Sequence, residues 1–165
     1  LILASLGFVI FVIPAIFDLM PAITTRNQYH QAQVFKILLL YGAFAFALIY
    51  IEMLIANIRS LPGDRKWGVK TIAYQLGFDK TKLIALISSI IVLALLIFSI
   101  VKYVYTREVL LYFIFAVIAP YLYFIIQLYY LKLEKMVNQI NILYNILRIV
   151  YTTGFISIIL LNYFN

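Results

Sequence analysis

The sequence predicts an all-α, polytopic transmembrane helix bundle with about five spans. Of its 165 residues, 66% are hydrophobic and only 12% are charged, whereas a soluble domain carries about 25% charged residues. The apolar residues come in runs of roughly 20, long enough to cross about 30 Å of hydrocarbon as helices. Open sheets are excluded in lipid because their edges leave backbone groups unpaired, and a barrel needs alternating apolar and polar residues.

Composition also excludes several kinds of site. The chain has no cysteine and only one histidine, His30, so disulfides, thiolate metal sites and histidine-cluster metal sites are ruled out. A Ser-His catalytic pair is disfavoured for the same reason. The net charge of +7 could indicate nucleic acid binding in a soluble protein, but here it indicates basic loops beside anionic lipid headgroups. We therefore expect the lipid bilayer, and no nucleic acid, as a partner.

The first expected span covers residues 1–17, and a polar loop follows it over residues 24–33. Pro14 either kinks this span or marks its end, because proline lacks a backbone donor and clashes with the preceding turn. His30 is interpreted as a solvated histidine of the loop. The chain begins inside an apolar run with Leu1, not with Met, which we interpret as the interior of a longer protein.

The second expected span covers residues 34–56. It contains small residues that suit close helix packing in lipid, namely Gly42, Ala43, Ala45 and Ala47. Glu52 lies near the end of this span. A carboxylate at that depth is costly, so Glu52 either faces protein or water, or reaches the membrane interface.

The segment 57–82 is the one long polar, basic stretch, and we expect it to form a loop. Pro62-Gly63 is expected to break the helix that enters it, and residues 66–76 form either a short interfacial helix or an ordered loop. Eight Lys/Arg side chains lie on this side of the membrane and four on the other. The positive-inside rule therefore predicts that this loop is cytoplasmic. We expect a multi-pass protein of the cell (plasma) membrane.

Three further spans are expected over residues 83–101, 109–131 and 142–161. The first of them is rich in Ile and Leu and should face lipid over much of its surface. The next is aromatic, and Pro120 should kink it near its middle. The last follows a loop over residues 132–141 and contains Arg148. This arginine either snorkels to the nearer interface or faces a polar cavity.

Oxygen-bearing and cationic side chains gather in the segment 57–82. Asn57, Ser60 and Asp64 are spaced i, i+3, i+7, so a continuous helix would put them on one face. Carboxylate oxygens can hold Mg²⁺ and leave positions for phosphate oxygens, and cations can neutralise a leaving diphosphate. The candidate cations are Arg59, Arg65, Lys66 and Lys70. The plainer interpretation is a solvated basic loop that obeys the positive-inside rule.

The stretch IANIRSLPGDRKWGVKTIAYQLG, residues 55–77, resembles the second conserved motif of the UbiA-type membrane prenyltransferases. That motif reads D-x-x-D-x-x-x-D, followed by a Gly, a Lys-Thr pair and a Leu-Gly pair. The matching framework here is Gly63, Asp64, Arg65, Lys66, Gly68, Lys70, Thr71, Leu76 and Gly77. Asn57 and Ser60 stand where the family has aspartates, and Glu52-Met53 stands where it commonly has an Arg-Glu pair. The resemblance implies that residues 1–165 are a partial domain, the C-terminal five helices of a nine-helix fold.

The resemblance also implies an activity, the transfer of an isoprenyl group from an isoprenyl diphosphate to a hydrophobic aromatic or lipid acceptor. Family members hold Mg²⁺ through two aspartate-rich motifs, one of which belongs to the N-terminal half of the domain. By this resemblance Asp64, Asn57 and Ser60 would form the catalytic site, with Asp64 and Asn57 as metal ligands. The diphosphate would be bound by Arg59, Arg65, Lys66 and Lys70.

Two alternatives to an active enzyme remain open. The two missing aspartates are compatible with a catalytically inactive membrane relative that binds isoprenoid lipid or a protein partner. A transporter is a third interpretation, in which Glu52 and Arg148 are the intramembrane charges.

Overall fold

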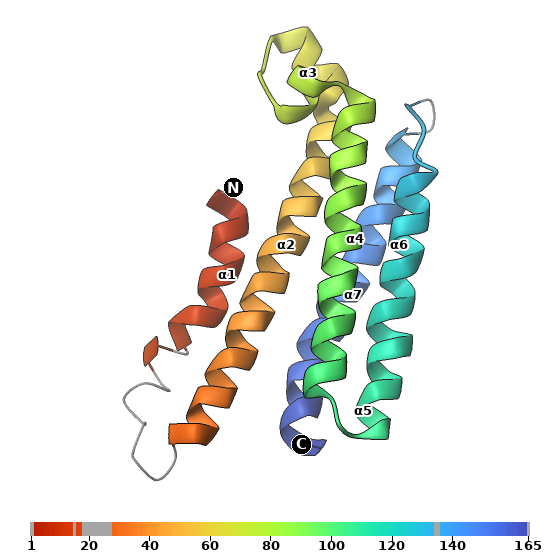
Figure 1. Cartoon of the computed structure of the whole chain (residues 1–165). Coiled ribbons are helices and arrows are strands. Elements are labelled where there is room, and N and C mark those ends of the chain that lie inside the picture. Colours follow the sequence, from red (N-terminus) through yellow and green to blue (C-terminus); the bar gives the residue numbers. More distant parts are fainter. Residues whose placement is uncertain (1, 15, 18–27, 134–135, 165) are drawn as a thin grey trace. The chain divides into compact units, whose positions relative to one another are not determined.

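The computed structural model describes residues 2–14, 16–17, 28–133 and 136–164 (Figure 1). Every regular element within these residues is a helix, so the predicted all-α class is confirmed. Three helical segments are long and apolar enough to cross a membrane, and they are Gln31–Trp67, Phe78–Tyr103 and Arg107–Tyr129. Their length and composition indicate a membrane-embedded protein. The count of five spans stays a prediction.

The chain divides into two compact units, residues 1–50 and residues 51–165. The first unit contains α1 (Ile2–Pro14) and the N-terminal part of α2 (Gln28–Trp67). Pro14 is the last residue of α1, and the choice between a kink and an end of the span at this proline stays a prediction. Within this unit Gly7 allows close packing, because an added Cβ would collide with the Cδ1 methyl of Ile49.

The expected loop over residues 24–33 is wrong from residue 28 onward, because α2 already begins at Gln28. His30 is therefore a helical residue and not a loop residue. Residues 24–27 of that expected loop lie outside the described residues. The polar composition of the segment predicted a loop, but polar residues also form the first turns of a helix before it enters an apolar environment.

The second unit begins inside α2, and this helix continues through Pro62 and Gly63 to Trp67. The predicted break at these residues is therefore wrong. Proline in a helix interior costs about 3 kcal/mol, but burial of an apolar stripe offsets this cost. The stripe is spaced by three and four residues and is at most 2% exposed, and it consists of Ile51, Leu54, Ile55, Ile58 and Leu61.

The expected loop over residues 57–82 is wrong for most of its length. After α2 ends at Trp67, a short turn leads to α3 (Ile72–Leu76), and α4 (Phe78–Tyr103) begins directly after Gly77. Residues 66–76 were expected to form either a short helix or an ordered loop, and a short helix is found over Ile72–Leu76. Gly77 joins the two helices with φ +83° and ψ 172°, a conformation open almost only to glycine.

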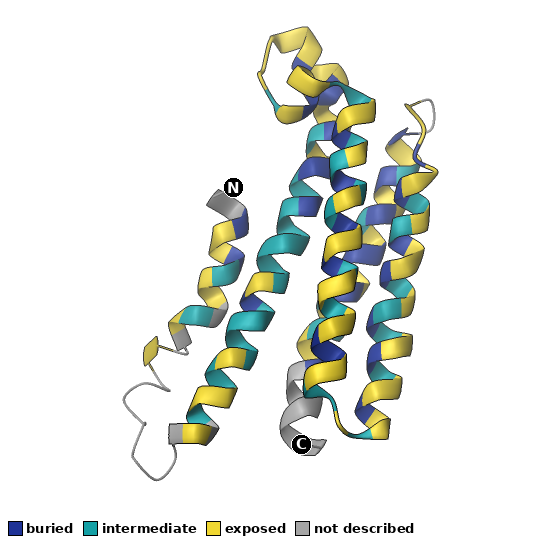
Figure 2. Ribbon diagram, viewed as in Figure 1, coloured by how far each residue is buried: buried dark blue, intermediate teal, exposed yellow. Residues whose placement is uncertain are grey.

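α4 has one face of small buried residues and one face of large exposed ones (Figure 2). Thr81, Ala85 and Ser89 are fully buried, and both hydroxyls donate to carbonyls of the preceding turn, so no polar group faces a neighbour unpaired. Small residues of this kind allow close helix approach in lipid. The exposed face agrees with the prediction of a lipid-facing surface and includes Leu83, Ile87, Ile90, Ile91, Leu95 and Phe98.

The fourth predicted span is a single helical rod with a change of winding inside it. It consists of α5 (Arg107–Tyr112), a π-helical segment η2 (Phe113–Ile118) and α6 (Ala119–Tyr129). The wider winding of η2 lies just before Pro120, which occupies the first turn of α6, and the kink expected at this proline stays a prediction. A π-helical turn is one way in which a helix accommodates a missing backbone donor.

The last helix, α7 (Met136–Phe164), contains the fifth predicted span and packs against α6, η2 and α5. The expected loop over 132–141 is wrong from Met136 onward, and its residues 134–135 lie outside the described residues. The core of this unit lies where the apolar faces of α2, α6 and α7 are buried. Its largest fully buried side chains include Tyr121, Phe124, Leu128, Ile140, Leu143 and Leu147.

Candidate functional site

Asp64 lies near the end of α2, is only 9% exposed, and accepts two side-chain hydrogen bonds at the same oxygen, Oδ2. Ser60 Oγ donates from one turn earlier at 2.7 Å, and Thr71 Oγ1 donates at 2.8 Å from the start of α3. The Thr71 hydroxyl also caps α3, because it accepts the Tyr74 N–H at 3.2 Å. The carboxylate therefore ties the end of α2 to the start of α3.

The three predicted site residues lie on one continuous helix, although a break at Pro62-Gly63 was expected between Ser60 and Asp64. Ser60 makes a second, longer contact of 3.3 Å, in which its hydroxyl meets the backbone carbonyl of Asn57. Sequence reasoning assigned no role to Thr71, although a threonine directly before a helical segment is a known capping signal. The structure adds this residue to the Asp64 cluster.

The donor set around Asp64 is poor in negative charge. Within the described residues, no group of three or more His, Cys, Asp or Glu side chains is placed to hold a metal ion. Mg²⁺ in phosphate sites is often bound by one or two carboxylates together with phosphate oxygens. Asp64 supplies one carboxylate, the smaller of these two numbers. Asn57 and Ser60 can add only neutral oxygens.

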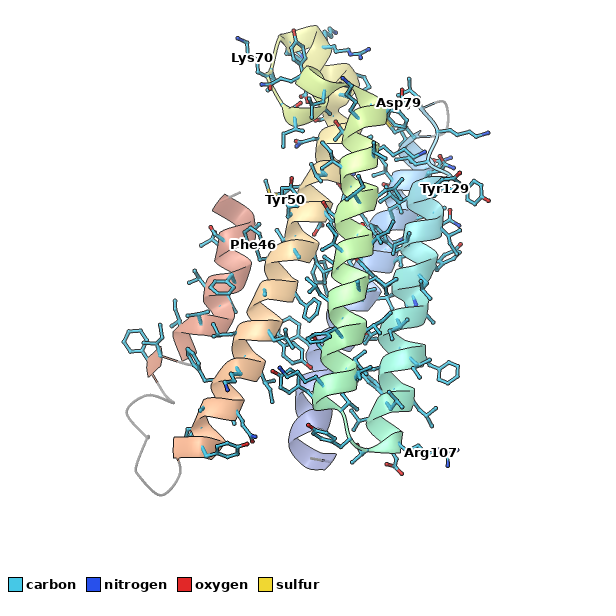
Figure 3. All side chains as sticks on the ribbon, in the orientation of Figure 1. Phe46, Tyr50, Lys70, Asp79, Arg107 and Tyr129 are labelled. Carbon is cyan, nitrogen blue, oxygen red and sulfur yellow. The ribbon has the colours of Figure 1, made fainter. Side chains whose placement is uncertain are left out.

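The four predicted diphosphate-binding cations are all exposed, and they have different neighbours. The Arg59 guanidinium lies 6.0 Å over the ring of Tyr144, and the Lys66 ammonium lies 5.8 Å over the ring of Trp67. Lys70 lies in the turn beside α3, at one end of the second unit (Figure 3). Arg65 lines a groove, described next.

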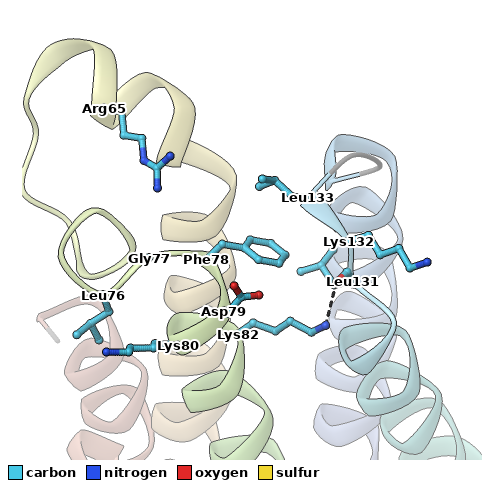
Figure 4. Close-up of a pocket in the computed structure, with 10 residues that line it drawn as sticks. All are labelled: Arg65, Leu76, Gly77, Phe78, Asp79, Lys80, Lys82, Leu131, Lys132 and Leu133. Carbon is cyan, nitrogen blue, oxygen red and sulfur yellow. Dashed lines mark hydrogen bonds between the residues drawn. The ribbon is translucent and has the colours of Figure 1, made fainter.

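A groove of about 740 Å³ lies at the same end of the second unit (Figure 4). It is formed by Arg65 of α2, the junction of α3 with α4, and the connection between α6 and α7. Besides Arg65, it is lined by the charged side chains Asp79, Lys80, Lys82 and Lys132. Sequence reasoning counted these lysines only as topology signals. Their gathering could not be read from the sequence, because Lys82 and Lys132 are brought together by tertiary packing.

A second polar cluster lies deeper in the bundle around Glu52. The Tyr151 hydroxyl of α7 donates to Glu52 Oε2 at 3.1 Å. Tyr144, which like Tyr151 is part of α7, has the Arg59 guanidinium 6.0 Å from the centre of its ring. Glu52 thus faces protein, the first of its two alternatives. Arg148 is exposed on α7, which favours the snorkelling alternative for that residue.

No family model matches this chain, and neither a curated protein nor a solved structure matches it. The resemblance to the UbiA-type prenyltransferases therefore stays a prediction that rests on residues 55–77. The groove and the Asp64 cluster are defined by the geometry alone.

Proposed function

We propose that the chain is the C-terminal part of a UbiA-type membrane prenyltransferase, with five spans of a nine-helix fold. The enzyme moves an isoprenyl group from an isoprenyl diphosphate to an aromatic or lipid acceptor in the cell membrane, with residues 57–82 on the cytoplasmic side. One observation carries this proposal. Asn57, Ser60 and Asp64 lie along one continuous helix, with Ser60 bonded to Asp64, at the end of the unit where basic side chains gather.

Each residue of the cluster has a role in this proposal. Asp64, helped by the neutral oxygen of Asn57, would hold Mg²⁺, which supplies positive charge to the diphosphate when bound. Ser60 and Thr71 fix the direction of the Asp64 carboxylate through their hydrogen bonds. The exposed cations around the turn neutralise the departing diphosphate, and they are Arg59, Arg65, Lys66 and Lys70.

A second candidate function is favoured by the way Asp64 is used. Its Oδ2 already accepts two hydroxyl groups, and the two neighbouring acidic positions of the family motif are Asn57 and Ser60. Asp64 is therefore well explained as a tie between α2 and α3. In this second candidate the protein is an inactive relative that binds isoprenoid lipid or a protein partner without transferring the isoprenyl group.

The activity is tested with the protein that contains this chain, expressed in membranes and given radiolabelled geranylgeranyl diphosphate, Mg²⁺ and hydrophobic acceptors. We expect labelled lipid from the unchanged protein. The Asp64→Ala variant should lose this labelling by about 100-fold or more, the order seen when a transition-state charge contact is removed. Asp79→Ala is the matched control, since Asp79 is an exposed carboxylate at the same end and should leave labelling unchanged. Equal labelling by the two variants would contradict the proposed transferase activity. So would a lack of labelled lipid from the unchanged protein.

The inactive candidate makes a different prediction. Restoring the charge with Asn57→Asp and Ser60→Asp should create Mg²⁺-dependent binding of the diphosphate, measured by equilibrium binding of the labelled compound. The unchanged protein should bind it weakly and without dependence on Mg²⁺. If the unchanged protein binds as tightly as the restored variant, the second candidate is wrong.

A further inference from the structure

The groove at the basic end of the second unit combines an excess of positive charge with a position where two candidate membrane spans end. Four cationic side chains and one carboxylate line it: Arg65, Lys80, Lys82, Lys132 and Asp79. Within the described residues neither Arg65 nor Lys82 forms an ion pair with a carboxylate. Because the cationic side chains that line the groove outnumber its one lining carboxylate, the groove can attract an anion from outside the chain.

Lys82 is the best-fixed of these cations. Its ammonium donates at 2.9 Å to the backbone carbonyl of Leu131, across the groove from α4 to the end of α6 (Figure 4). It also lies 5.9 Å from the centre of the Tyr129 ring. An ammonium carries three donors, so Lys82 keeps further donors for a ligand after bonding Leu131. A side chain already held in place loses less entropy when it binds a ligand.

The groove lies where two candidate spans end. Lys80 and Lys82 are in the first turns of α4, and Leu131 to Leu133 follow the end of α6. Tyr129 and Tyr130 beside it are 63% and 60% exposed, and tyrosine is enriched at the level of lipid headgroups. Next along the two helices, Leu83 and Ile126 are exposed apolar side chains. A ligand here can have both an anionic head and apolar chains.

From these observations we infer that the groove binds the phosphate headgroup of an anionic bilayer lipid. Lys82 and Arg65 hold the phosphate oxygens, and the exposed apolar faces of α4 and α6 contact the acyl chains. Basic pockets between transmembrane helices are a recurring way to recognise such lipids. The groove shares Arg65 with the proposed diphosphate-binding cations. The inference still does not require transferase activity, because Asn57, Ser60 and Asp64 do not line the groove.

The test measures lipid retained by the purified protein in native mass spectrometry. The protein, in non-ionic detergent, is given equal amounts of phosphatidylglycerol and phosphatidylcholine with identical acyl chains. We expect it to retain the anionic lipid preferentially. The Arg65→Gln/Lys82→Gln variant should lower that preference by about 30-fold, from roughly 1 kcal/mol for each basic residue near a membrane surface. An unchanged preference in this variant overturns the inference.

Two further variants control for charge and folding. Lys102→Gln/Arg107→Gln removes two exposed charges from the far end of α4 and the start of α5 and should keep the full preference. An equal loss in this control overturns the inference, because the effect is then one of net charge. Lys80→Gln/Lys132→Gln leaves the Lys82–Leu131 bond in place, so it should lower the preference even if Lys82→Gln perturbs the fold. Retention of the preference in this variant, when Arg65→Gln/Lys82→Gln unfolds, also counts against the inference.

A competition experiment distinguishes a lipid from a free phosphate compound. Inorganic pyrophosphate is added at the same concentration as phosphatidylglycerol, and the retained lipid is measured again. We expect the lipid to stay bound, because its apolar chains contribute to binding and pyrophosphate has none. Displacement of the lipid by pyrophosphate would show a site for free anions and contradict the lipid assignment.

Discussion

The hydroxyl of Tyr151 in α7 donates a 3.1 Å hydrogen bond to the carboxylate of Glu52 in α2. The two residues are 99 positions apart in the sequence, so the bond joins the first and last helices of the second unit. A carboxylate among apolar helices is costly unless it has a partner, and Tyr151 supplies one. The pair is therefore a polar contact between these two helices.

Removal of the Tyr151 hydroxyl should destabilise the protein. In Tyr151→Phe the ring remains, but Glu52 loses its donor, and we expect a loss of about 1–2 kcal/mol in the free energy of unfolding. Unfolding of the detergent-solubilised protein, followed by circular dichroism, measures the change. Tyr123→Phe is the matched control, since Tyr123 is 49% exposed on α6. Equal stabilities of the two variants would show that the Glu52 contact contributes nothing.

Loss of one Asp64 hydrogen bond should loosen the turn between α2 and α3. Asp64→Asn removes the charge that Ser60 and Thr71 both donate to, a contact worth roughly 1.5–3 kcal/mol when one partner is charged. Trypsin cleaves after exposed Arg and Lys, and the end of α2 and the turn after it offer three such sites at Arg65, Lys66 and Lys70. We expect cleavage there about tenfold or more faster than in the unchanged protein. A cleavage rate equal to that of the control Asp79→Asn would show that the Asp64 hydrogen bonds do not hold the end of α2 to the start of α3.

Gly77 and Gly63 should respond in opposite directions to replacement by alanine. Gly77 joins α3 to α4 with a positive φ of 83°, so Gly77→Ala should cost about 1–3 kcal/mol of stability. Gly63 is inside α2, and an added Cβ would meet no atom within 4 Å. Gly63→Ala should therefore stabilise the protein by about 0.5–1 kcal/mol. Thermal unfolding of both variants in the same detergent measures the two changes in stability. Changes of the same sign would contradict the expected difference in backbone strain between Gly77 and Gly63.

The membrane-crossing assignment can be tested cleanly, because the chain contains no cysteine. Single cysteines are introduced as Lys70→Cys, Lys102→Cys and Lys132→Cys, which flank α4 and the rod of α5, η2 and α6. If α4 and the rod of α5, η2 and α6 each cross the bilayer once, positions 70 and 132 lie on one side and position 102 on the other. Labelling of sealed vesicles with an impermeant maleimide, in both orientations, reads the side of each position. Labelling of all three from one side would contradict the crossings.

The helical class could be predicted from the sequence because long apolar runs have only one common solution in lipid. The helix boundaries could not, since they depend on packing. Pro62 predicted a break that the buried stripe around Ile58 and Leu61 overrides. The spacing of Asn57, Ser60 and Asp64 predicted that a continuous helix would place them on one face, but the break expected at Pro62 meant that the helix itself was not predicted. The groove was missed because Arg65, Lys82 and Lys132 meet only after the helices pack.

The π-helical segment η2 sets the rotational phase of the helix that follows it. Val109, Phe113, Val117 and Tyr121 are all buried and are spaced by four residues. In a regular α-helix each step of four residues turns the stripe by about 40° beyond a full turn. The wider winding of η2 removes part of this drift, so Tyr121 stays on the buried face and its hydroxyl reaches the Ser89 carbonyl at 3.3 Å. A deletion of one residue in η2 would rotate every later side chain of α6 relative to α4.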